Sequence, residues 1–333
     1  MFYMALRKAL LPRITLMVCL TAVVTWAGPV EIQTGKDRIE VKVDGKPFTT
    51  YYFGAATAKP YLMPLRTASG VIVTRGFPVG NDASAGDPKS SAFEPHQRPL
   101  YFAHGDIDGL DFWSEAVFAH YYDDHNRQAY GHMVLDKIED PANGQDSGSI
   151  RARFHLEDPN NRVIADETQK FTFGGGEGIR TIDCEFVIEA THGPVVMGDT
   201  KEGTFGIRLA QELSAPHDRM TNSEGARGEQ QIWGRPADWV SYAGAIGGKA
   251  VGIAVFDHPK SFRHPTTWHA RAYGLFAANP FGLREFSNDP HKDGSWTIPE
   301  GKSLTFRYEV LIYDGEMSSS RIEAAYRKYA SGN

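Results

Sequence analysis

Short runs of alternating apolar and polar residues, separated by turn residues, recur along most of the chain. Residues 38–54 read RIEVKVDGKPFTTYYFG, where the Asp44-Gly45 step predicts a tight β-hairpin. The runs are rich in β-branched and aromatic residues, which suit half-buried strands. Similar patterns predict a strand over 150–158, hairpins over 170–190 and 239–259, and a closing strand over 303–315.

One segment has a clear helical period. In residues 318–330, apolar side chains recur at Ile322, Ala325, Tyr326 and Tyr329, and serines precede them as candidate N-caps. Strands and helices do not alternate, which argues against a parallel sheet. The pattern predicts an all-β fold, a large antiparallel β-sandwich with one C-terminal helix.

The first 27 residues have the pattern of a secretory signal. Basic residues precede an apolar run at 14–24, and small residues stand at Thr25 and Ala27. This run of eleven residues is shorter than the roughly 20 that span a bilayer. We therefore expect a signal peptide over 1–27, a single domain over 28–333, and a periplasmic or extracellular location.

The charge balance bears on the class of partner. The chain has 35 Lys and Arg against 41 Asp and Glu, a net charge of -6, and the leader removes basic residues only. An acidic mature chain is a poor match for nucleic acid or an anionic membrane. Cys19 leaves with the leader, so Cys184 has no intrachain disulfide partner.

Residues 94–113 concentrate side chains that suit proton transfer and sugar binding. A histidine beside a carboxylate is a common general base, and a tryptophan face suits the apolar side of a sugar ring. The alternative is a polar turn in which the aspartates bond their own backbone. The side chains in question are His96, Arg98, His104, Asp106, Asp108 and Trp113.

A second polar stretch, 256–282, holds three histidines in the pattern H-x5-H-x4-H. This spacing differs from helical metal pairs and from closely spaced zinc motifs. Prolines at 259 and 265 predict an extended, projecting loop. We expect a proton-transfer or hydroxyl-binding role and no cofactor. The alternative is a metal site formed by His258 and His264 with His96.

Several longer motifs resemble one known family. The segments KPYLMPLRTASGVIVTRGFP, HQRPLYFAHGDIDGLDFW, DTKEGTFGIRLA and FRYEVLIYDG resemble those of an exported bacterial family usually labelled methane oxygenase PmoA, or PmoA-like. The resemblance implies a domain of unknown function with a galactose-mutarotase-like β-supersandwich. After the leader the chain has no apolar run of roughly 20 residues, which excludes a membrane-spanning methane monooxygenase.

The chain departs from the family pattern at two places. Glu94, Gln97 and Pro99 stand where the family more often has His, His and Gly, whereas His96 and Arg98 match. Tyr313 also replaces a common histidine. These departures point to an altered or specialised member.

The resemblance implies a histidine and a carboxylate flanking a sugar ring. We expect His104 or His269 as the general base and Glu202 as the acid, although Glu202 beside Lys201 also fits a solvated surface pair. The side chains expected to bind substrate are Arg75, Arg98, Asp106, Trp113, Arg263, His264, Trp268 and Asn279.

The leading functional prediction is an exported carbohydrate-active protein of hydrolase, lyase or epimerase type, acting on a sugar or oligosaccharide. A glycan-binding module without turnover is the first alternative. A metal-dependent oxidoreductase, as the family label suggests, is the second.

Overall fold

The computed structural model describes residues 28–76, 94–121, 129–214 and 219–332. The predicted signal peptide, 1–27, lies outside the described residues. So do residues 77–93, 122–128, 215–218 and 333.

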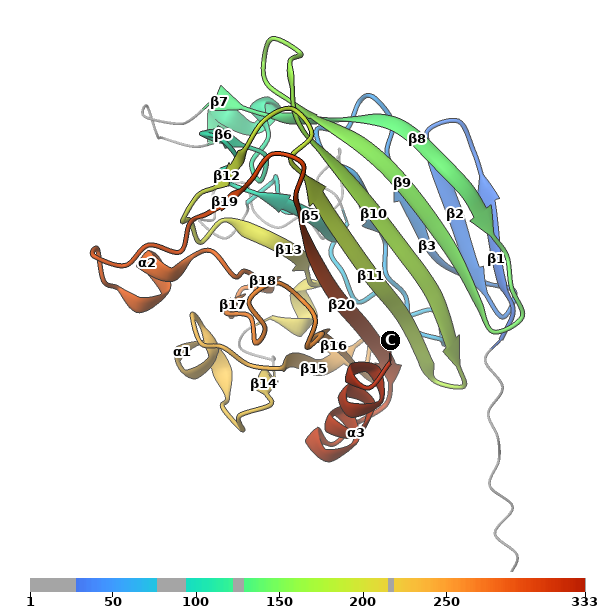
Figure 1. The fold of residues 1–333 in the computed structure, drawn as a ribbon. Coiled ribbons are helices and arrows are strands. Elements are labelled where there is room, and N and C mark those ends of the chain that lie inside the picture. Colours follow the sequence, from blue (N-terminus) through green and yellow to red (C-terminus); the bar gives the residue numbers. More distant parts are fainter. Residues whose placement is uncertain (1–27, 77–93, 122–128, 215–218, 333) are drawn as a thin grey trace, which may run out of the picture.

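Most described strands belong to two eight-stranded sheets that lie in layers (Figure 1). The first sheet has, in spatial order, β1 (Val30–Thr34), β2 (Arg38–Val43), β3 (Lys46–Tyr52), β4 (Tyr61–Met63), β5 (Leu100–His104), β13 (Gly203–Arg208), β18 (Leu275–Ala278) and β17 (Trp268–Ala270). The second has β14 (Thr221–Asn222), β15 (Trp239–Ile246), β16 (Lys249–Asp257), β20 (Ser303–Asp314), β11 (Ile179–Glu189), β10 (Val163–Gly176), β9 (Ser147–Glu157) and β8 (His132–Ala142).

The described residues also form two two-stranded sheets and several helices. The pairs β12 (Val195–Met197) with β19 (Trp296–Ile298), and β6 (Leu110–Asp111) with β7 (Ala129–Tyr130), form two-stranded sheets. The helices are 3-10 segments η2 (Ala116–Tyr121) and η3 (Gln211–Leu213), and α1 (Gly228–Ile232), α2 (Leu283–Ser287) and α3 (Ser319–Ala330).

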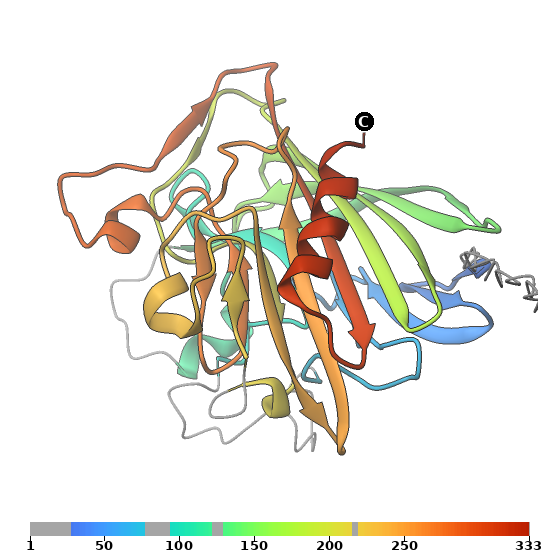
Figure 2. The same ribbon diagram turned by 90° about the horizontal axis from the view of Figure 1, so that it is seen from below.

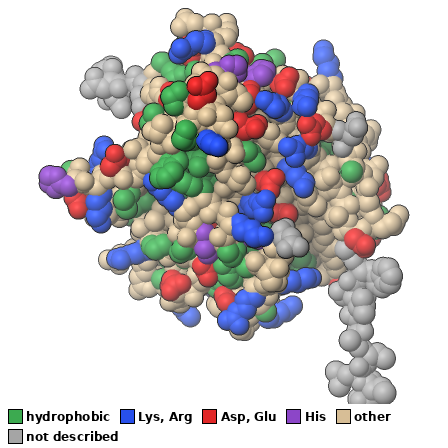
Figure 3. Space-filling model, viewed as in Figure 1, with side chains coloured by type: hydrophobic (Ala, Val, Ile, Leu, Met, Phe, Trp, Pro, Cys, Tyr) green, Lys and Arg blue, Asp and Glu red, His purple; other side chains and the backbone are tan. Residues whose placement is uncertain are grey.

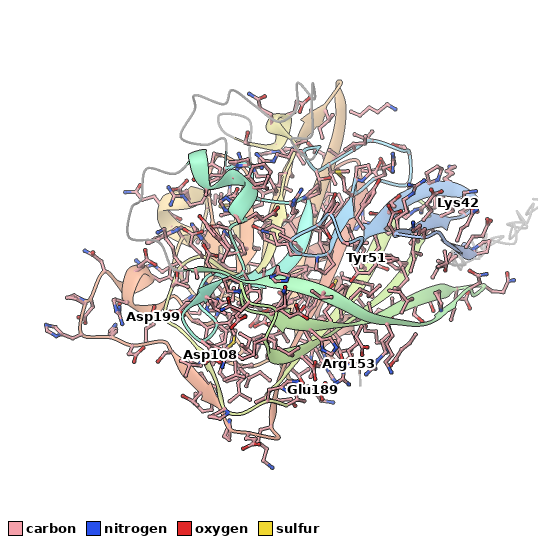
Figure 4. The ribbon with its side chains drawn as sticks, turned by 90° about the horizontal axis from the view of Figure 1, so that it is seen from above. Lys42, Tyr51, Asp108, Arg153, Glu189 and Asp199 are labelled. Atoms are coloured by element: carbon pink, nitrogen blue, oxygen red, sulfur yellow. The ribbon has the colours of Figure 1, made fainter. Side chains whose placement is uncertain are left out.

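The core lies between the facing sides of the two sheets. Phe102 of β5 stacks on Phe186 of β11 with ring centroids 4.2 Å apart, and Phe205 of β13 stacks on Tyr308 of β20 at 4.8 Å. Tyr51 of β3 lies between the two layers in Figure 4 and contacts the Phe171 ring at 5.3 Å. Alternate residues of the same strands therefore point away from the core.

The C-terminal helix is confirmed. Ser318 caps α3 by accepting a hydrogen bond from the Arg321 amide. Its apolar side, with Ile322 and Tyr326, packs on Phe256 and neighbouring residues of the second sheet (Figure 2).

The all-β prediction and its hairpins are also confirmed, with two differences in detail. Residues 256–282 are not a loop throughout, because β17 and β18 form a hairpin there and join the first sheet. The short apolar runs on each side of the 271–274 turn explain this pairing. Helices α1 and α2, of five residues each, are too short to show a helical period.

The outward side of the second sheet carries an ion-pair ladder. Arg153 of β9 contacts Asp166 at 2.8 Å, and Arg151 contacts Glu139 at 2.8 Å. On the face seen in Figure 3, cationic and anionic side chains are interspersed. Among the described helices, none has the length and hydropathy of a membrane span.

Candidate functional site

The first sheet carries a continuous row of residues across its outer face, the face turned away from the second sheet. Register pairing places six residues from six strands opposite one another, so their side chains share that face. We call this set the transverse row. It consists of Tyr52, Tyr61, Tyr101, Gly206, Ala277 and His269.

The middle of the transverse row is a close contact between aromatic rings and a glycine. The Trp113 ring lies 4.7 Å from the Tyr101 ring, centroid to centroid. A Cβ atom at Gly206 would come within 2.9 Å of both rings. Position 206 therefore requires glycine so that both rings can pack this close to the sheet.

A buried charged triad holds Trp113 in place. The Arg98 guanidinium binds both carboxylate oxygens of Glu115, and the Lys59 ammonium lies 3.2 Å from the same carboxylate. Lys59 also donates to the Trp113 carbonyl and lies 4.8 Å from the centre of the Tyr101 ring. Burial lowers the pKa of Lys59 to about 8, while Glu115 opposes that shift. Breaking such a triad leaves an uncompensated buried charge.

A second group of polar side chains adjoins Tyr101. Arg75 donates to the Gln97 carbonyl at 2.8 Å, and Arg208 donates to the Gln97 side-chain oxygen at 2.6 Å. The Arg208 guanidinium also lies 4.5 Å from the centre of the Tyr273 ring. Burial raises the pKa of Tyr101 well above its ordinary value, which keeps the phenol protonated.

Beside His269, at the other end of the transverse row, lies a rim of partly exposed charged side chains. The Lys201 ammonium contacts the Glu285 carboxylate at 2.8 Å and the Glu202 carboxylate at 3.4 Å. The Lys201 and Glu202 side chains are each 35% exposed, so a solute can reach them. Glu285 of α2 also accepts from the Lys201 amide, which fixes the backbone there.

His269 lies beneath this rim in a defined tautomer. Its Nδ1 lies 2.9 Å from the Lys201 carbonyl oxygen, which can only accept, so Nδ1 carries the proton. Its Nε2 is then an acceptor, and it has no hydrogen-bond partner among the described residues. Burial lowers the pKa of His269 to about 4, so the ring is neutral at neutral pH.

Aromatic and charged side chains complete the rim around His269. The Trp233 ring lies 6.2 Å from the His269 ring, edge to face. Arg271 pairs with Glu229 at 2.9 Å, and both side chains are 32% exposed. The rim thus offers carboxylates, cations and an indole to a polar ligand.

His104 lies on the opposite side of the first sheet from the transverse row. Its ring packs 4.9 Å from Phe281, which itself contacts Phe306 of the second sheet. Its Nε2 lies 2.8 Å from the Gly198 carbonyl oxygen. Asp106 accepts from the Gly109 amide at 3.0 Å, so its carboxylate binds the backbone of its own turn, as in the alternative interpretation of this motif. The structure therefore does not bring His104 together with Glu202 and His269.

Four other predicted site residues make structural contacts. Arg263 donates to the carbonyls of Pro280, Gly294 and Ser295. Trp268 is fully buried and donates to the Ala237 carbonyl at 2.9 Å.

Asn279 donates to the Thr200 carbonyl at 2.9 Å, so it supports the backbone that leads to Lys201. His264 lies 2.8 Å from Asp257, near the end of β16. Asp199, labelled in Figure 4, accepts from the amides of Arg284 and Gly294 and ties the α2 loop to the rim.

The three histidines of the metal alternative are not gathered at one centre. His96 lies 3.5 Å from Glu94 beside the Trp113 ring. His258 accepts from the Lys260 amide and packs against Tyr329 near the C-terminal helix. Among the described residues there is no group of three or more His, Cys, Asp or Glu placed to hold a metal ion.

Sequence reasoning missed several residues of this face. A lysine within the apolar segment 58–65 is a weak signal for the buried Lys59, and alternation in LYFAH gives one for Tyr101. Other missed residues carried no signal in the sequence pattern. They are Glu115, Arg208, Trp233, Tyr273 and Glu285.

Comparison with known proteins gives a family but no activity. Residues 38–327 match the family of unknown function DUF6807. This match does not support the methane-oxygenase label suggested by the sequence motifs. No curated protein matches the chain.

Several solved structures are similar at low identity. They include an α-galactosidase from Lactobacillus brevis (7% identity, TM-score 0.39, covering 88% of this chain and 40% of that one). The GH36 α-galactosidase AgaA from Geobacillus stearothermophilus has 11% identity and TM-score 0.40, covering 87% and 41%. A galactose mutarotase-like protein from Clostridium acetobutylicum has 10% identity and TM-score 0.38, covering 88% and 99%. The chain spans about two fifths of each α-galactosidase.

Proposed function

The chain belongs to the family of unknown function DUF6807, and on that premise we propose that it binds a carbohydrate at the His269 end of the transverse row and catalyses proton transfer there. The observation that carries this proposal is the buried, unprotonated Nε2 of His269, in a ring whose Nδ1 binds the carbonyl of Lys201, a residue of the partly exposed charged rim. A buried acceptor with no partner among the described residues suits a ligand hydroxyl.

The composition of the rim favours a carbohydrate over other small polar ligands. Carboxylates at Glu202 and Glu229 accept hydroxyl hydrogen bonds, and the cations of Lys201 and Arg271 donate them. The Trp233 ring offers an apolar surface beside them.

In the proposed reaction, His269 takes a proton from the sugar at Nε2 and later returns it to a sugar oxygen. Its low pKa keeps it unprotonated in the resting state. The Glu202 carboxylate, whose charge the Lys201 ammonium stabilises, orients a hydroxyl and offsets the positive charge that develops on His269 as it takes the proton. We propose this role for Glu202 in place of the acid expected from the sequence.

A binding and turnover screen tests the proposal. Purified protein is incubated with a panel of neutral sugars and glycosides, with binding and products followed by NMR. We expect one or more sugars to bind and be converted. Glu202→Gln should lose conversion by about 100-fold or more.

The matched control is Glu185→Gln. Glu185 forms a comparable surface pair with Arg307 at 2.9 Å on the outward side of the second sheet. This variant should match the wild type. Binding without any product would favour the non-catalytic alternative, and the absence of binding by every sugar would contradict the proposal.

We also propose that the protein acts outside the cytoplasm, as a periplasmic or secreted enzyme. The proposal rests on the basic and apolar pattern of residues 1–27. The N-terminal sequence of the protein recovered from cell fractions is the test. A mature chain beginning at Gly28 is the expected result, and an uncleaved cytoplasmic chain would contradict it.

A further inference from the structure

The last turn of helix α3, residues 327–330, lies beside a carboxyl group on the outward side of the second sheet. Tyr313 and Leu311 of β20 belong to the apolar cluster that packs beneath α3, and Glu309 is the next residue of β20 on the same side. We propose that Glu309 carries a proton while the last turn of α3 is docked on the sheet, and that loss of this proton releases that turn.

Strand register places Glu309 between an acidic and an aromatic neighbour. Asp183 of β11 lies directly opposite it on one side, and Phe256 of β16 lies opposite it on the other. Like charges directly opposite each other on paired strands are destabilising. The Phe256 ring contacts the Tyr329 ring of α3 with centroids 6.2 Å apart, so the docked turn adds to the burial of the carboxyl group.

The surroundings of Glu309 disfavour a negative charge. Among the described residues, Glu309 has no ion pair and no side-chain hydrogen bond. The Tyr329 hydroxyl is buried and has no hydrogen-bond partner there either, so it does not donate to Glu309 or Asp183. Burial, and then the charge of Asp183, raise the pKa of Glu309 to about 7, and the Lys328 ammonium of α3 opposes this shift.

The other charged groups on the strands do not supply a counter-charge for Glu309. Arg307 of β20 pairs with Glu185 of β11 at 2.9 Å, so these two charges offset each other. Lys170 of β10 acts on Asp183. Two further carboxylates, Asp146 and Glu177, line the same hollow as Glu309.

One histidine also contacts the last turn of α3. The His258 ring packs 5.0 Å from the Tyr329 ring, edge to face. Burial lowers the pKa of His258, so the docked turn favours its neutral ring. Protonation of His258 at low pH would therefore oppose docking, which is the reverse of the effect expected from Glu309.

The direction of the pH dependence follows from the raised pKa of Glu309 in the docked state. When the turn is released, Glu309 meets water and its pKa returns to its ordinary value near 4.5. Docking is therefore fully favoured below pH 4.5, and this advantage is lost as the pH rises through 7. The two pKa values correspond to a change of at most about 300-fold in the ratio of docked to released turn.

Amide hydrogen exchange of residues 327–330 tests the inference. It is measured on the full protein between pH 4 and 8 and corrected for the intrinsic exchange rate. Protection of these amides should fall about 10- to 300-fold between pH 4.5 and 7, while the amides of β20 stay protected. Glu309→Gln should keep the turn protected throughout, because the side chain stays neutral. Asp183→Asn should move the fall to lower pH, because it removes the repelling charge.

The matched control is Glu189→Gln, also on the outward side of β11. Glu189 lies opposite Ser303, so no acidic residue faces it on β20, and it is 36% exposed and 3.9 Å from Arg153. This variant should keep the wild-type pH dependence. Unchanged protection of the wild-type turn between pH 4.5 and 7 would overturn the inference, as would a wild-type pH dependence in Glu309→Gln. If Glu309→Gln does not fold, an unchanged pH dependence in Asp183→Asn would overturn it.

Discussion

Two histidines on opposite faces of the first sheet are alike in almost every local respect. His104 and His269 are 1% and 2% exposed, and burial lowers the pKa of each to about 4. Each has one ring nitrogen within 2.9 Å of a backbone carbonyl oxygen. In each, the second nitrogen has no hydrogen-bond partner among the described residues.

What differs is the surroundings of the second nitrogen. In His104 it lies against Gly203, where an added Cβ would come within 2.3 Å of Nδ1. The His269 ring lies beside the Trp233 and Phe286 rings, and its Nδ1 partner is the carbonyl of Lys201, whose side chain is 35% exposed. Burial and pKa are therefore the same for the two histidines, and the proposed role of His269 rests on the face of the sheet on which it lies.

The largest expected effect separates the two histidines by activity. His269→Ala should lower turnover of the converted sugar by about 100- to 10,000-fold, because it removes the proton acceptor. His104→Ala should keep turnover within a few-fold for the folded fraction. Steady-state kinetics on both variants, with circular dichroism to measure the folded fraction, gives the comparison. Equal losses of turnover in the two variants would contradict the distinction between the two histidines.

The two histidines should contribute equally to the pH dependence of the protein's stability. Each has a folded pKa of about 4, below the ordinary value near 6.5, so folding favours the neutral ring. Each neutral histidine therefore adds to the free energy of unfolding above pH 6.5, and this contribution is lost as the pH falls through 4. The loss between pH 6.5 and 4 is about 3 kcal/mol for each histidine.

His104→Gln and His269→Gln should each reduce the loss of stability between pH 6.5 and 4, as measured by denaturant unfolding. A variant that keeps the wild-type pH dependence would show that its ring protonates freely in the folded protein.

Substitutions at two neighbouring positions on β13 test the difference between the outer face and the core face of the first sheet. Gly206→Ala should destabilise the protein by about 1–3 kcal/mol, since the new methyl group collides with Trp113 and Tyr101. Ile207→Val, on the core side, should cost about 0.5–1.5 kcal/mol. Thermal unfolding measures both. Gly206→Ala should also weaken sugar binding, whereas Ile207→Val should not, and the reverse result would contradict the assignment of faces.

The smallest expected effect concerns the rim. Glu202→Gln and Glu185→Gln should each change the free energy of unfolding by less than about 0.5 kcal/mol, because both carboxylates form exposed pairs. Chemical denaturation measures this. A loss of several kcal/mol in Glu202→Gln would mean that its effect on turnover reflects folding and not chemistry.

The sequence predicts the fold better than the site for a physical reason. The hairpin at Asp44-Gly45 and helix α3 depend on contacts between residues close in the chain, so period and turn residues reveal them. The transverse row joins positions 52, 61, 101, 206, 277 and 269. That alignment depends on strand register between distant segments, which no local pattern encodes.

Trp268 and Arg263 illustrate the same limit. Both residue types bind sugars, yet here their hydrogen bonds go to backbone carbonyls of neighbouring segments. The sequence gives the residue type and not the direction of the side chain. His269, by contrast, is among the predicted site residues, and it lies on the outer face of the first sheet.

The central claim is that His269, and not His104, meets the ligand. Two-dimensional ¹H–¹⁵N spectra of the histidine rings, recorded while a bound sugar is titrated, test it most directly. We predict that the Nε2 resonance of His269 shows an unprotonated nitrogen in the free protein and shifts as the sugar binds, while both His104 nitrogens stay unchanged. A shift at His104, or saturating sugar binding with no change at His269, would contradict the account.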